Sequence, residues 1–138
     1  MTFRFLLLIL LFCPFAYAWI EEVDDCKVCR PIYNSTCRGV GVPSLKTSCA
    51  TAKETGVEYT FGLLHQIFPH VPVNSCGTVI TCPLRTSSTI KIENKEFPAP
   101  TLYHWCEETG KNTGKWYARF VHENVEITSV ACKSIVRK

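Results

Sequence analysis

Residues 68–83 read FPHVPVNSCGTVITCP, and the fold we predict for the whole chain starts from this stretch. Prolines stand at positions 69, 72 and 83, and the two cysteines, Cys76 and Cys82, enclose five residues. Each proline fixes its own φ and lacks a backbone donor, so residues 68–73 should form a stiff extended loop rather than a paired strand. A bond between Cys76 and Cys82 would close a short loop and hold Phe68 in one position. The stretch therefore predicts a rigid aromatic residue presented by a β scaffold.

The first eighteen residues have the pattern of a secretory signal peptide. Arg4 is their only charged residue, residues 5–15 are almost wholly apolar, and Ala16-Tyr17-Ala18 is a small-x-small cleavage site. We expect cleavage before Trp19 and a single domain over residues 19–138. No second long apolar run follows, so we expect the mature chain to be soluble.

The cysteine count points to an oxidising compartment. Residues 1–18 carry one of the nine cysteines and one basic residue, which leaves eight cysteines and a net charge of +2. An even number of cysteines in a small secreted chain favours four disulfides, although spacing alone does not decide their pairing. Cys26-x-x-Cys29 is also the spacing of half a redox or zinc site. No second ligand pair completes such a site, so we expect structural half-cystines and no metal.

The net charge and one glycosylation sequon lead to expectations about partners and modification. The weak positive charge comes without a basic cluster interleaved with aromatic residues, so no nucleic-acid partner is expected. Asn34-Ser35-Thr36 is a glycosylation sequon, and the signal peptide predicts that Asn34 is modified. A secreted protein with this glycan would either stay outside the cell or be taken into the lysosomal lumen.

Alternation of apolar and polar residues predicts β-strands. No segment shows a sustained period of 3.6, and short strands between Pro and Gly turns indicate an all-β sandwich. We expect Phe97-Pro98-Ala99-Pro100 to interrupt one strand and His122-Glu123-Asn124 to be a hairpin turn. The expected strands cover residues 57–68, 88–93, 102–106, 116–120 and 125–136.

Catalytic motifs are missing from the sequence. The four histidines, at positions 65, 70, 104 and 122, are neither paired at ligand spacing nor arranged as in small secreted ribonucleases. A hydrolase needs a nucleophile, a base and an orienting group that converge, and no motif singles out such a set. We therefore expect no enzymatic activity and no cofactor.

Large aromatic side chains are the feature of the sequence that indicates a ligand-binding function. Most of them should be ordinary core, but Phe68 and Tyr103 each adjoin proline-rich backbone, which suits the rim of a pocket. Two sheets held slightly apart leave a slot about 10 Å across, which is enough for a flat apolar ligand. The aromatic residues on or beside the expected strands are Tyr59, Phe61, Phe68, Phe97, Tyr103, Trp105, Trp116, Tyr117 and Phe120.

These residues resemble the ML lipid-recognition domain family, and within it the sterol-transfer members. Gly62-Leu63-Leu64, Phe68-Pro69 and Cys76-x5-Cys82-Pro83 stand in the family's order and near its spacing. The similarity extends from Cys49 to the C-terminus and includes residues 57–61, 94–103 and the last hairpin. The segment between Phe61 and Cys76 is shorter than in the family, and residues 19–48 match in their cysteines alone.

The resemblance implies an immunoglobulin-like β-sandwich, stapled by disulfides, that holds a sterol or another lipid between its sheets without catalysis. It places Phe68 and Tyr103 on aromatic positions of the lipid tunnel and Ala99 on a valine position. It also implies the bridges Cys76–Cys82, Cys37–Cys49 and Cys26–Cys132, and it leaves Cys29 and Cys106, which have no counterparts, to pair with each other.

We therefore expect a secreted, monomeric protein that binds a sterol or related lipid and delivers it to a membrane surface or a membrane acceptor protein. The alternative is a secreted protein ligand or receptor cofactor without a working pocket. A cystine-knot hormone is a weaker alternative, since no Cys-x-Gly-x-Cys occurs. The side chains expected to contact the lipid are Phe68, Ala99, Tyr103, Tyr59, Phe61, Trp116 and Phe120.

Overall fold

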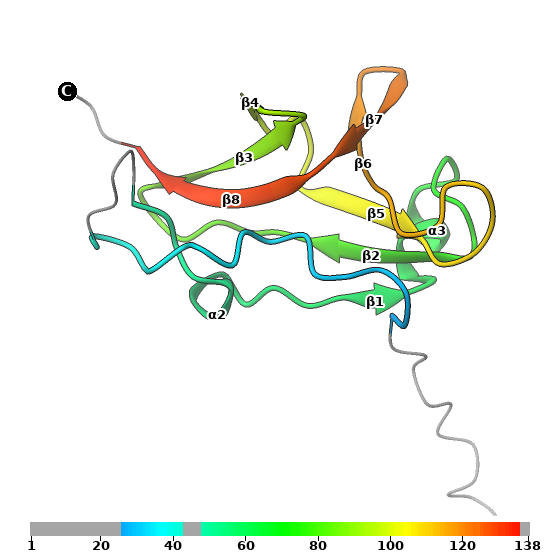
Figure 1. Ribbon diagram of the computed structural model, residues 1–138, viewed down its shortest axis with the longest axis horizontal. Coiled ribbons are helices and arrows are strands. Elements are labelled where there is room, and N and C mark those ends of the chain that lie inside the picture. The colour runs from blue at the N-terminus through cyan, green and yellow to red at the C-terminus, as the bar shows by residue number, and fades with distance from the viewer. Residues whose placement is uncertain (1–25, 43–47, 136–138) are drawn as a thin grey trace, which may run out of the picture.

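Two antiparallel sheets form the framework of the computed structural model, which describes residues 26–42 and 48–135 (Figure 1). The larger sheet has the strand order β1-β2-β5-β6-β7, and the smaller sheet has the order β4-β3-β8. The predicted all-β sandwich is thus confirmed, whereas the predicted signal peptide, residues 1–18, lies outside the described residues. The strands are β1 (Thr60–Phe61), β2 (Ser75–Val79), β3 (Thr86–Ile92), β4 (Lys95–Pro98), β5 (Tyr103–Glu107), β6 (Trp116–Phe120), β7 (Glu123–Ile127) and β8 (Ser129–Ser134).

The larger sheet has an inner face, toward the smaller sheet, and an outer face. In β6, Trp116 is buried and the next residue, Tyr117, is half-buried, because successive side chains of a strand point to opposite faces. The strand register places Cys106 of β5 opposite both Cys76 of β2 and Trp116 of β6. These three residues share the inner face, and Trp105 and Tyr117 lie on the outer face.

The chain passes from one sheet to the other between β7 and β8. β7 pairs with β6, whereas β8 pairs with β3, and Thr128 lies between them. The backbone N–H of Thr128 donates to the carbonyl oxygen of Lys91 in β3 at 2.8 Å, which joins the two sheets at this corner. The prediction of one strand over residues 125–136 is therefore wrong. A run with period two does not reveal which sheet it pairs with.

Two strands lie outside the ranges in which strands were predicted. Residues 75–79 form β2 in the middle of the larger sheet, since the prolines at 69, 72 and 83 all lie outside this strand. Residues 95–98 form β4, which pairs with β3 at the edge of the smaller sheet. Pro98 is tolerated there because an edge strand does not need every backbone donor.

Two short helices lie among the strands. α2 (Ala52–Thr55) begins at a capping box made by Thr51 and Glu54 and ends at Gly56, in a left-handed conformation with φ 64°. α3 (Leu63–Ile67) comes shortly after β1, so the strand predicted over residues 57–68 is confirmed at residues 60–61 and wrong elsewhere. Apolar residues four apart, such as Leu64 and Phe68, fit one face of a helix as well as they fit a buried strand.

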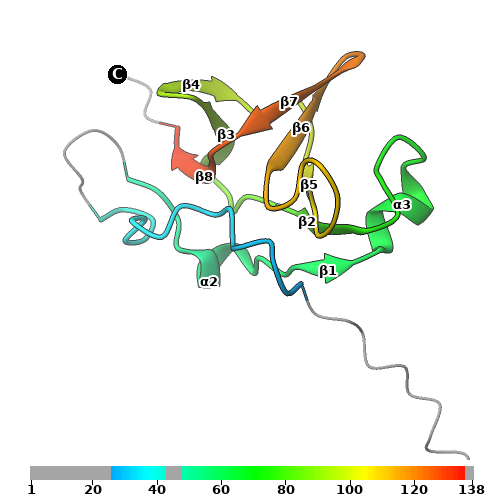
Figure 2. The ribbon, with the colours of Figure 1, turned by 45° about the vertical axis from the view of Figure 1, so that its right-hand side comes forward.

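The hydrophobic core fills the space between the two sheets. Ile90 and Val130 of the smaller sheet and Ala118 and Ile127 of the larger sheet are almost fully buried there. Each lies on the inner face of its strand, as the alternation of burial requires. The β3–β4 and β6–β7 hairpins both extend beyond this core on the same side of the molecule (Figures 1 and 2).

Four disulfides staple the sandwich. Cys37–Cys49 and Cys29–Cys106 are paired as expected. The expected Cys76–Cys82 and Cys26–Cys132 bridges are wrong, since Cys76 is bonded to Cys26 and Cys82 to Cys132. The reason is that β2 continues from Cys76 to Val79 and carries the backbone away from Cys76. At about 3.3 Å per residue, these three residues of strand already span roughly 10 Å, which is beyond the reach of one disulfide.

The segment of residues 26–37, called here the N-terminal segment, is fastened to both sheets. Its disulfides tie it to β2 through Cys76 and to β5 through Cys106. Tyr33 forms a parallel bridge with Val130 of β8, and the N–H of Asn34 donates to the carbonyl oxygen of Val130 at 2.8 Å. The segment therefore covers one open side of the sandwich, between β8 and β1, as Figure 1 shows.

Among the described residues, no helix is long and apolar enough to cross a membrane. The longer of the two helices that the structure describes, α3, has five residues.

Candidate functional site

The seven side chains predicted to contact a lipid fall into two groups. Phe68 and Tyr103 pack together with Leu64, Val71 and Trp105 on the outer face of the larger sheet. The other five lie on the inner side of the sandwich. Tyr59, Ala99, Trp116 and Phe120 pack against or belong to the core between the sheets, and Phe61 lies opposite the inward-facing Cys76.

The outer group forms a row of aromatic rings. Phe68 stacks on Tyr103 with a centroid distance of 3.9 Å and an interplanar angle of 12°. Tyr103 and Trp105 follow at 6.1 Å, and Trp105 and Tyr117 also at 6.1 Å. The expectation that Phe68 and Tyr103 line a slot between the sheets is therefore wrong. Tyr103 alternates in β5 with the buried His104, and α3 carries Phe68 across the outer face.

His70 holds this row in place. Its Nε2 lies 2.9 Å from the Tyr103 hydroxyl, and its ring meets Trp105 edge-on at 5.6 Å. Burial, with the Arg119 charge as a smaller cause, lowers the pKa of His70 below its usual value. Burial also raises the pKa of Tyr103, so both groups stay neutral near pH 7. The row is thus a packed, hydrogen-bonded unit.

A glycine allows α3 to lie directly on β2. A Cβ atom at Gly77 would lie 2.5 Å from Cδ1 of Leu64, which is much closer than carbon atoms approach one another. Leu64 is buried against this strand, and the N–H of Phe68 donates to its carbonyl oxygen at 2.7 Å. The absence of a side chain at Gly77 therefore sets the position of Phe68.

Tyr59 and Trp116 use their polar atoms to hold the N-terminal segment. Their rings meet edge to face at 5.7 Å. The Tyr59 hydroxyl accepts from the N–H of Tyr33 at 3.2 Å, and Trp116 Nε1 donates to the carbonyl oxygen of Arg30 at 2.8 Å. Both side chains also line open surface hollows, of about 450 Å³ and 470 Å³ respectively. Their observed role is to anchor the N-terminal segment.

The apolar interior reaches the surface between the β3–β4 and β6–β7 hairpins. Phe97 pairs with the inward-facing Ile90, so its ring points to the inner side, yet 39% of the residue is exposed. Phe120 and Val125 come from the other hairpin, on the inner face that they share with Ala118, and both are only half-buried. We call this region the apolar mouth, and its inward-facing side chains are Ile92, Phe97, Ala99, Phe120 and Val125.

Two inward-facing side chains have buried polar atoms that lack a hydrogen-bond partner among the described residues. His104 of β5 is 0% exposed, and neither of its ring nitrogens has a hydrogen-bond partner among the described residues. Ser88 of β3 lies opposite Cys132 in the strand register and therefore faces inward, and its hydroxyl also lacks a partner in the described part of the chain. Burial lowers the pKa of His104 to about 4, so the ring is neutral at pH 7.

Sequence reasoning did not single out His104. A lone histidine in an apolar strand has no ligand spacing and is usually an ordinary part of a core. One signal was available, because Cys106 is two residues later and a disulfide cysteine in a strand is normally inward. The alternation within residues 102–106 would have placed His104 on the same inner face.

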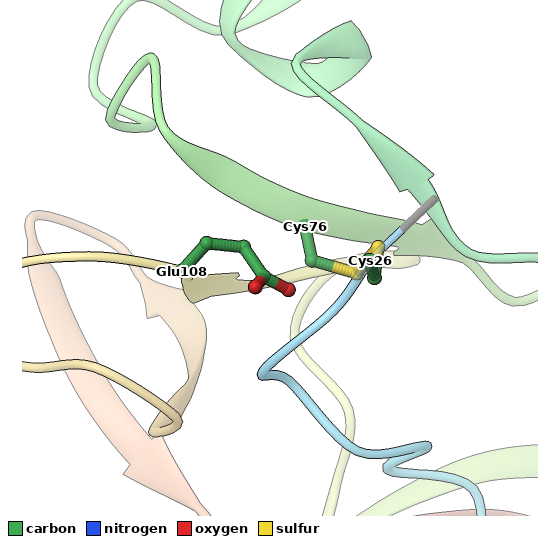
Figure 3. A group of neighbouring side chains, drawn as sticks. All are labelled: Cys26, Cys76 and Glu108. Carbon is green, nitrogen blue, oxygen red and sulfur yellow. A yellow bond between two sulfur atoms is a disulfide. The ribbon is translucent and has the colours of Figure 1, made fainter. Parts of the chain in front are cut away.

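Three side chains of metal-ligand type gather beside the N-terminal segment. The ligand atoms of Cys26, Cys76 and Glu108 all lie within 4.8 Å of one another (Figure 3). The two cysteines form a disulfide, whose sulfur atoms are not the thiolates that bind metals. The carboxylate of Glu108 accepts from the N–H groups of Val28 at 2.6 Å and Cys29 at 3.1 Å. This group therefore fastens the N-terminal segment rather than holding an ion.

Comparison with known proteins identifies a family. Residues 21–134 match the protein family described as "Caenorhabditis protein of unknown function, DUF282". No curated protein and no solved structure matches the chain.

Proposed function

This chain belongs to the Caenorhabditis protein family of unknown function DUF282, and we propose from its residues that it binds a sterol or related lipid and delivers it. The ligand would lie between the two sheets, as in the ML lipid-recognition domains that the sequence resembles. The outer aromatic row is not part of this proposed site.

The apolar mouth is the observation that carries the proposal. Large apolar side chains on the inner face of a strand normally pack against the opposite sheet. At the mouth this packing is incomplete: Ile92, Ala99 and Phe120 contact the core but stay only partly buried, and Phe97 keeps more than a third of its surface exposed. An apolar surface beside an interior that holds a few buried polar groups fits the mostly apolar lining of small-molecule sites.

Entry of a lipid requires the two hairpins to move apart. The β3–β4 hairpin has an edge strand whose four residues are all exposed, and the β6–β7 hairpin has its tip at Val121, which is also exposed. The opposite side of the sandwich is closed by the N-terminal segment, which disulfides fasten to β2 and β5. We therefore place the opening at the apolar mouth, where no disulfide among the described residues links the two hairpins.

Secretion and glycosylation belong to the same proposal. Four disulfides in one small domain are typical of proteins from oxidising compartments. The side chain of Asn34 takes part in a local turn, where its Oδ1 accepts from the N–H of Thr36 at 3.0 Å and from the Thr36 hydroxyl at 2.7 Å. Ser35 and Thr36 are exposed, which suits modification of Asn34.

The test is native mass spectrometry of protein secreted from eukaryotic cells, followed by titration with a fluorescent sterol. We expect a co-purifying lipid mass and saturable sterol binding. Phe97→Asp, at the mouth, should weaken binding by roughly 10- to 150-fold, because it removes an aromatic contact and adds a charge. Leu84→Asp is the matched control, since Leu84 is 93% exposed and lies outside the mouth.

One observation favours a different function, that of a secreted protein ligand. Leu63 and Ile67 are four residues apart on α3, so they lie side by side, and they are 47% and 60% exposed. If native mass spectrometry and titration find no lipid while Leu63→Ser and Ile67→Ser together abolish binding to cells, this alternative replaces lipid transport.

A further inference from the structure

The buried polar atoms of His104 and Ser88 have no structural task that the described residues reveal. Buried polar groups in proteins almost always have hydrogen-bond partners, and each exception calls for an explanation. His104 comes from the larger sheet and Ser88 from the smaller one, and both face the same interior. Ser75 also lacks a partner among the described residues, but it alternates with the inward Cys76 and so lies on the other face of β2.

The strand register connects His104 to the apolar mouth. β5 and β6 pair so that Trp105 lies opposite Tyr117, and the same register sets His104 beside Ala118. Ala118 is two residues from Phe120, on the same face of β6. The small side chain of Ala118 thus lies between the mouth and the histidine. Ser88, in the smaller sheet, also lies next to the apolar mouth, because its carbonyl oxygen accepts from the N–H of Ala99 at 2.9 Å.

We propose that His104, with Ser88, binds an uncharged hydroxyl group of the lipid, which enters through the apolar mouth hydroxyl first. This inference rests on the proposed function and names the ligand class more narrowly, as a sterol or another lipid alcohol. A neutral imidazole offers one N–H donor and one acceptor nitrogen, and a hydroxyl group can use both kinds of partner.

A fatty acid fits this site less well. Its carboxylate would lose its hydration on entering the interior, and such a charge is tolerated when a cation accompanies it. His104 supplies no positive charge, because its burial disfavours the protonated ring. The chemistry of the pair therefore selects a neutral polar head with an apolar body.

The experiment compares two fluorescent probes that differ at one oxygen, dehydroergosterol with its free 3-hydroxyl group and the same sterol as its 3-acetate. The intact secreted protein should bind the free sterol about 10- to 100-fold more tightly than the acetate, because the ester cannot donate a hydrogen bond. His104→Leu should remove this difference by weakening the free sterol alone. Ser88→Ala should reduce it severalfold.

Two controls separate binding from folding. His104→Gln keeps a donor and an acceptor and should restore most of the discrimination. A melting curve of His104→Leu should show an equal or higher midpoint than the parent protein, because an unpartnered buried polar group has been replaced by an apolar one. A merely structural histidine would instead lower the melting midpoint without changing the ratio of the two affinities.

The outcomes are distinct. Equal binding of the two probes by the parent protein overturns the hydroxyl site but leaves the lipid carrier standing. If His104→Leu still discriminates between the two probes, the hydroxyl site is likewise overturned and the lipid carrier stands. Binding of neither probe, with no co-purifying lipid, overturns both this inference and the proposed function.

Discussion

Gly77→Ala should destabilise the protein because α3 lies against β2 without room for another carbon. A Cβ at position 77 would lie 2.5 Å from Cδ1 and 2.6 Å from Cγ of Leu64, whereas carbon atoms pack at about 3.5–4.0 Å. Gly77 does not have a positive φ, so the clash alone opposes the alanine. The helix must shift by roughly 1 Å, and such overpacking costs about 1–3 kcal/mol of unfolding free energy.

A double-mutant cycle with Leu64 tests this explanation. Leu64→Ala removes Cγ and Cδ1 and should cost about 2–5 kcal/mol alone, because Leu64 is buried. In the double variant the new methyl group enters the space that the leucine has left. The combined loss should therefore be smaller than the sum of the single losses by about 1–3 kcal/mol.

The assay is denaturant unfolding with the disulfides intact, followed by tryptophan fluorescence, since Trp105 packs in the same cluster as Leu64. Leu63→Ala is the control, because Leu63 is on the same helix but half-exposed, and its effect should add to that of Gly77→Ala. A loss of less than about 0.5 kcal/mol for Gly77→Ala, or strict additivity with Leu64→Ala, would refute the contact between α3 and β2.

Three other predictions concern different parts of the molecule. Phe68→Ala should lower the unfolding free energy by roughly 1–3 kcal/mol and leave sterol affinity unchanged, since its ring stacks on the outer face; a titration that shows weaker binding at unchanged stability would contradict this. Stability should fall by about 3 kcal/mol between pH 7 and pH 4, because the unfolded chain takes up a proton at the ordinary histidine pKa of 6.5 whereas burial lowers the pKa of His104 to about 4. The same unfolding series on His104→Leu should lack this component, and identical pH profiles would count against it. Peptide mapping of unreduced protein should find Cys26 joined to Cys76, and Cys76→Ser should cost about 2–5 kcal/mol; a peptide that links Cys76 to Cys82 would disprove the pairing.

Most of the sheet could be predicted because burial on one face leaves a period of two in the sequence. Trp116, Ala118 and Phe120 show it in β6, and Ile90 and Ile92 show it in β3. β2 could not be predicted because prolines precede and follow it, although none lies within it. The switch of sheets at Thr128 was also hidden, since neighbouring strands are chosen by contacts between distant residues and leave no local pattern.

The site was harder to predict than the fold. An aromatic residue next to proline can lie on either face of a sheet. The short helix α3, which ends at Phe68, places this residue on the outer face. Disulfide pairing depends on where strands bring cysteines together, so likeness in spacing misled the assignment of Cys76. His104 became a candidate through its lack of hydrogen-bond partners among the described residues, which no sequence pattern records.

The pairing of the cysteines has a consequence for biosynthesis. Cys37–Cys49 spans 12 residues, but Cys26 and Cys29 bond to residues that lie 50 and 77 positions later. Because a chain is made from its N-terminus, these two thiols are exposed to oxidant before their proper partners exist. Early bonds among the first cysteines must then be broken by thiol–disulfide exchange, which takes seconds to hours without an isomerase. Depletion of protein disulfide isomerase should therefore reduce the yield of secreted protein and leave the melting temperature of the correctly paired product unchanged.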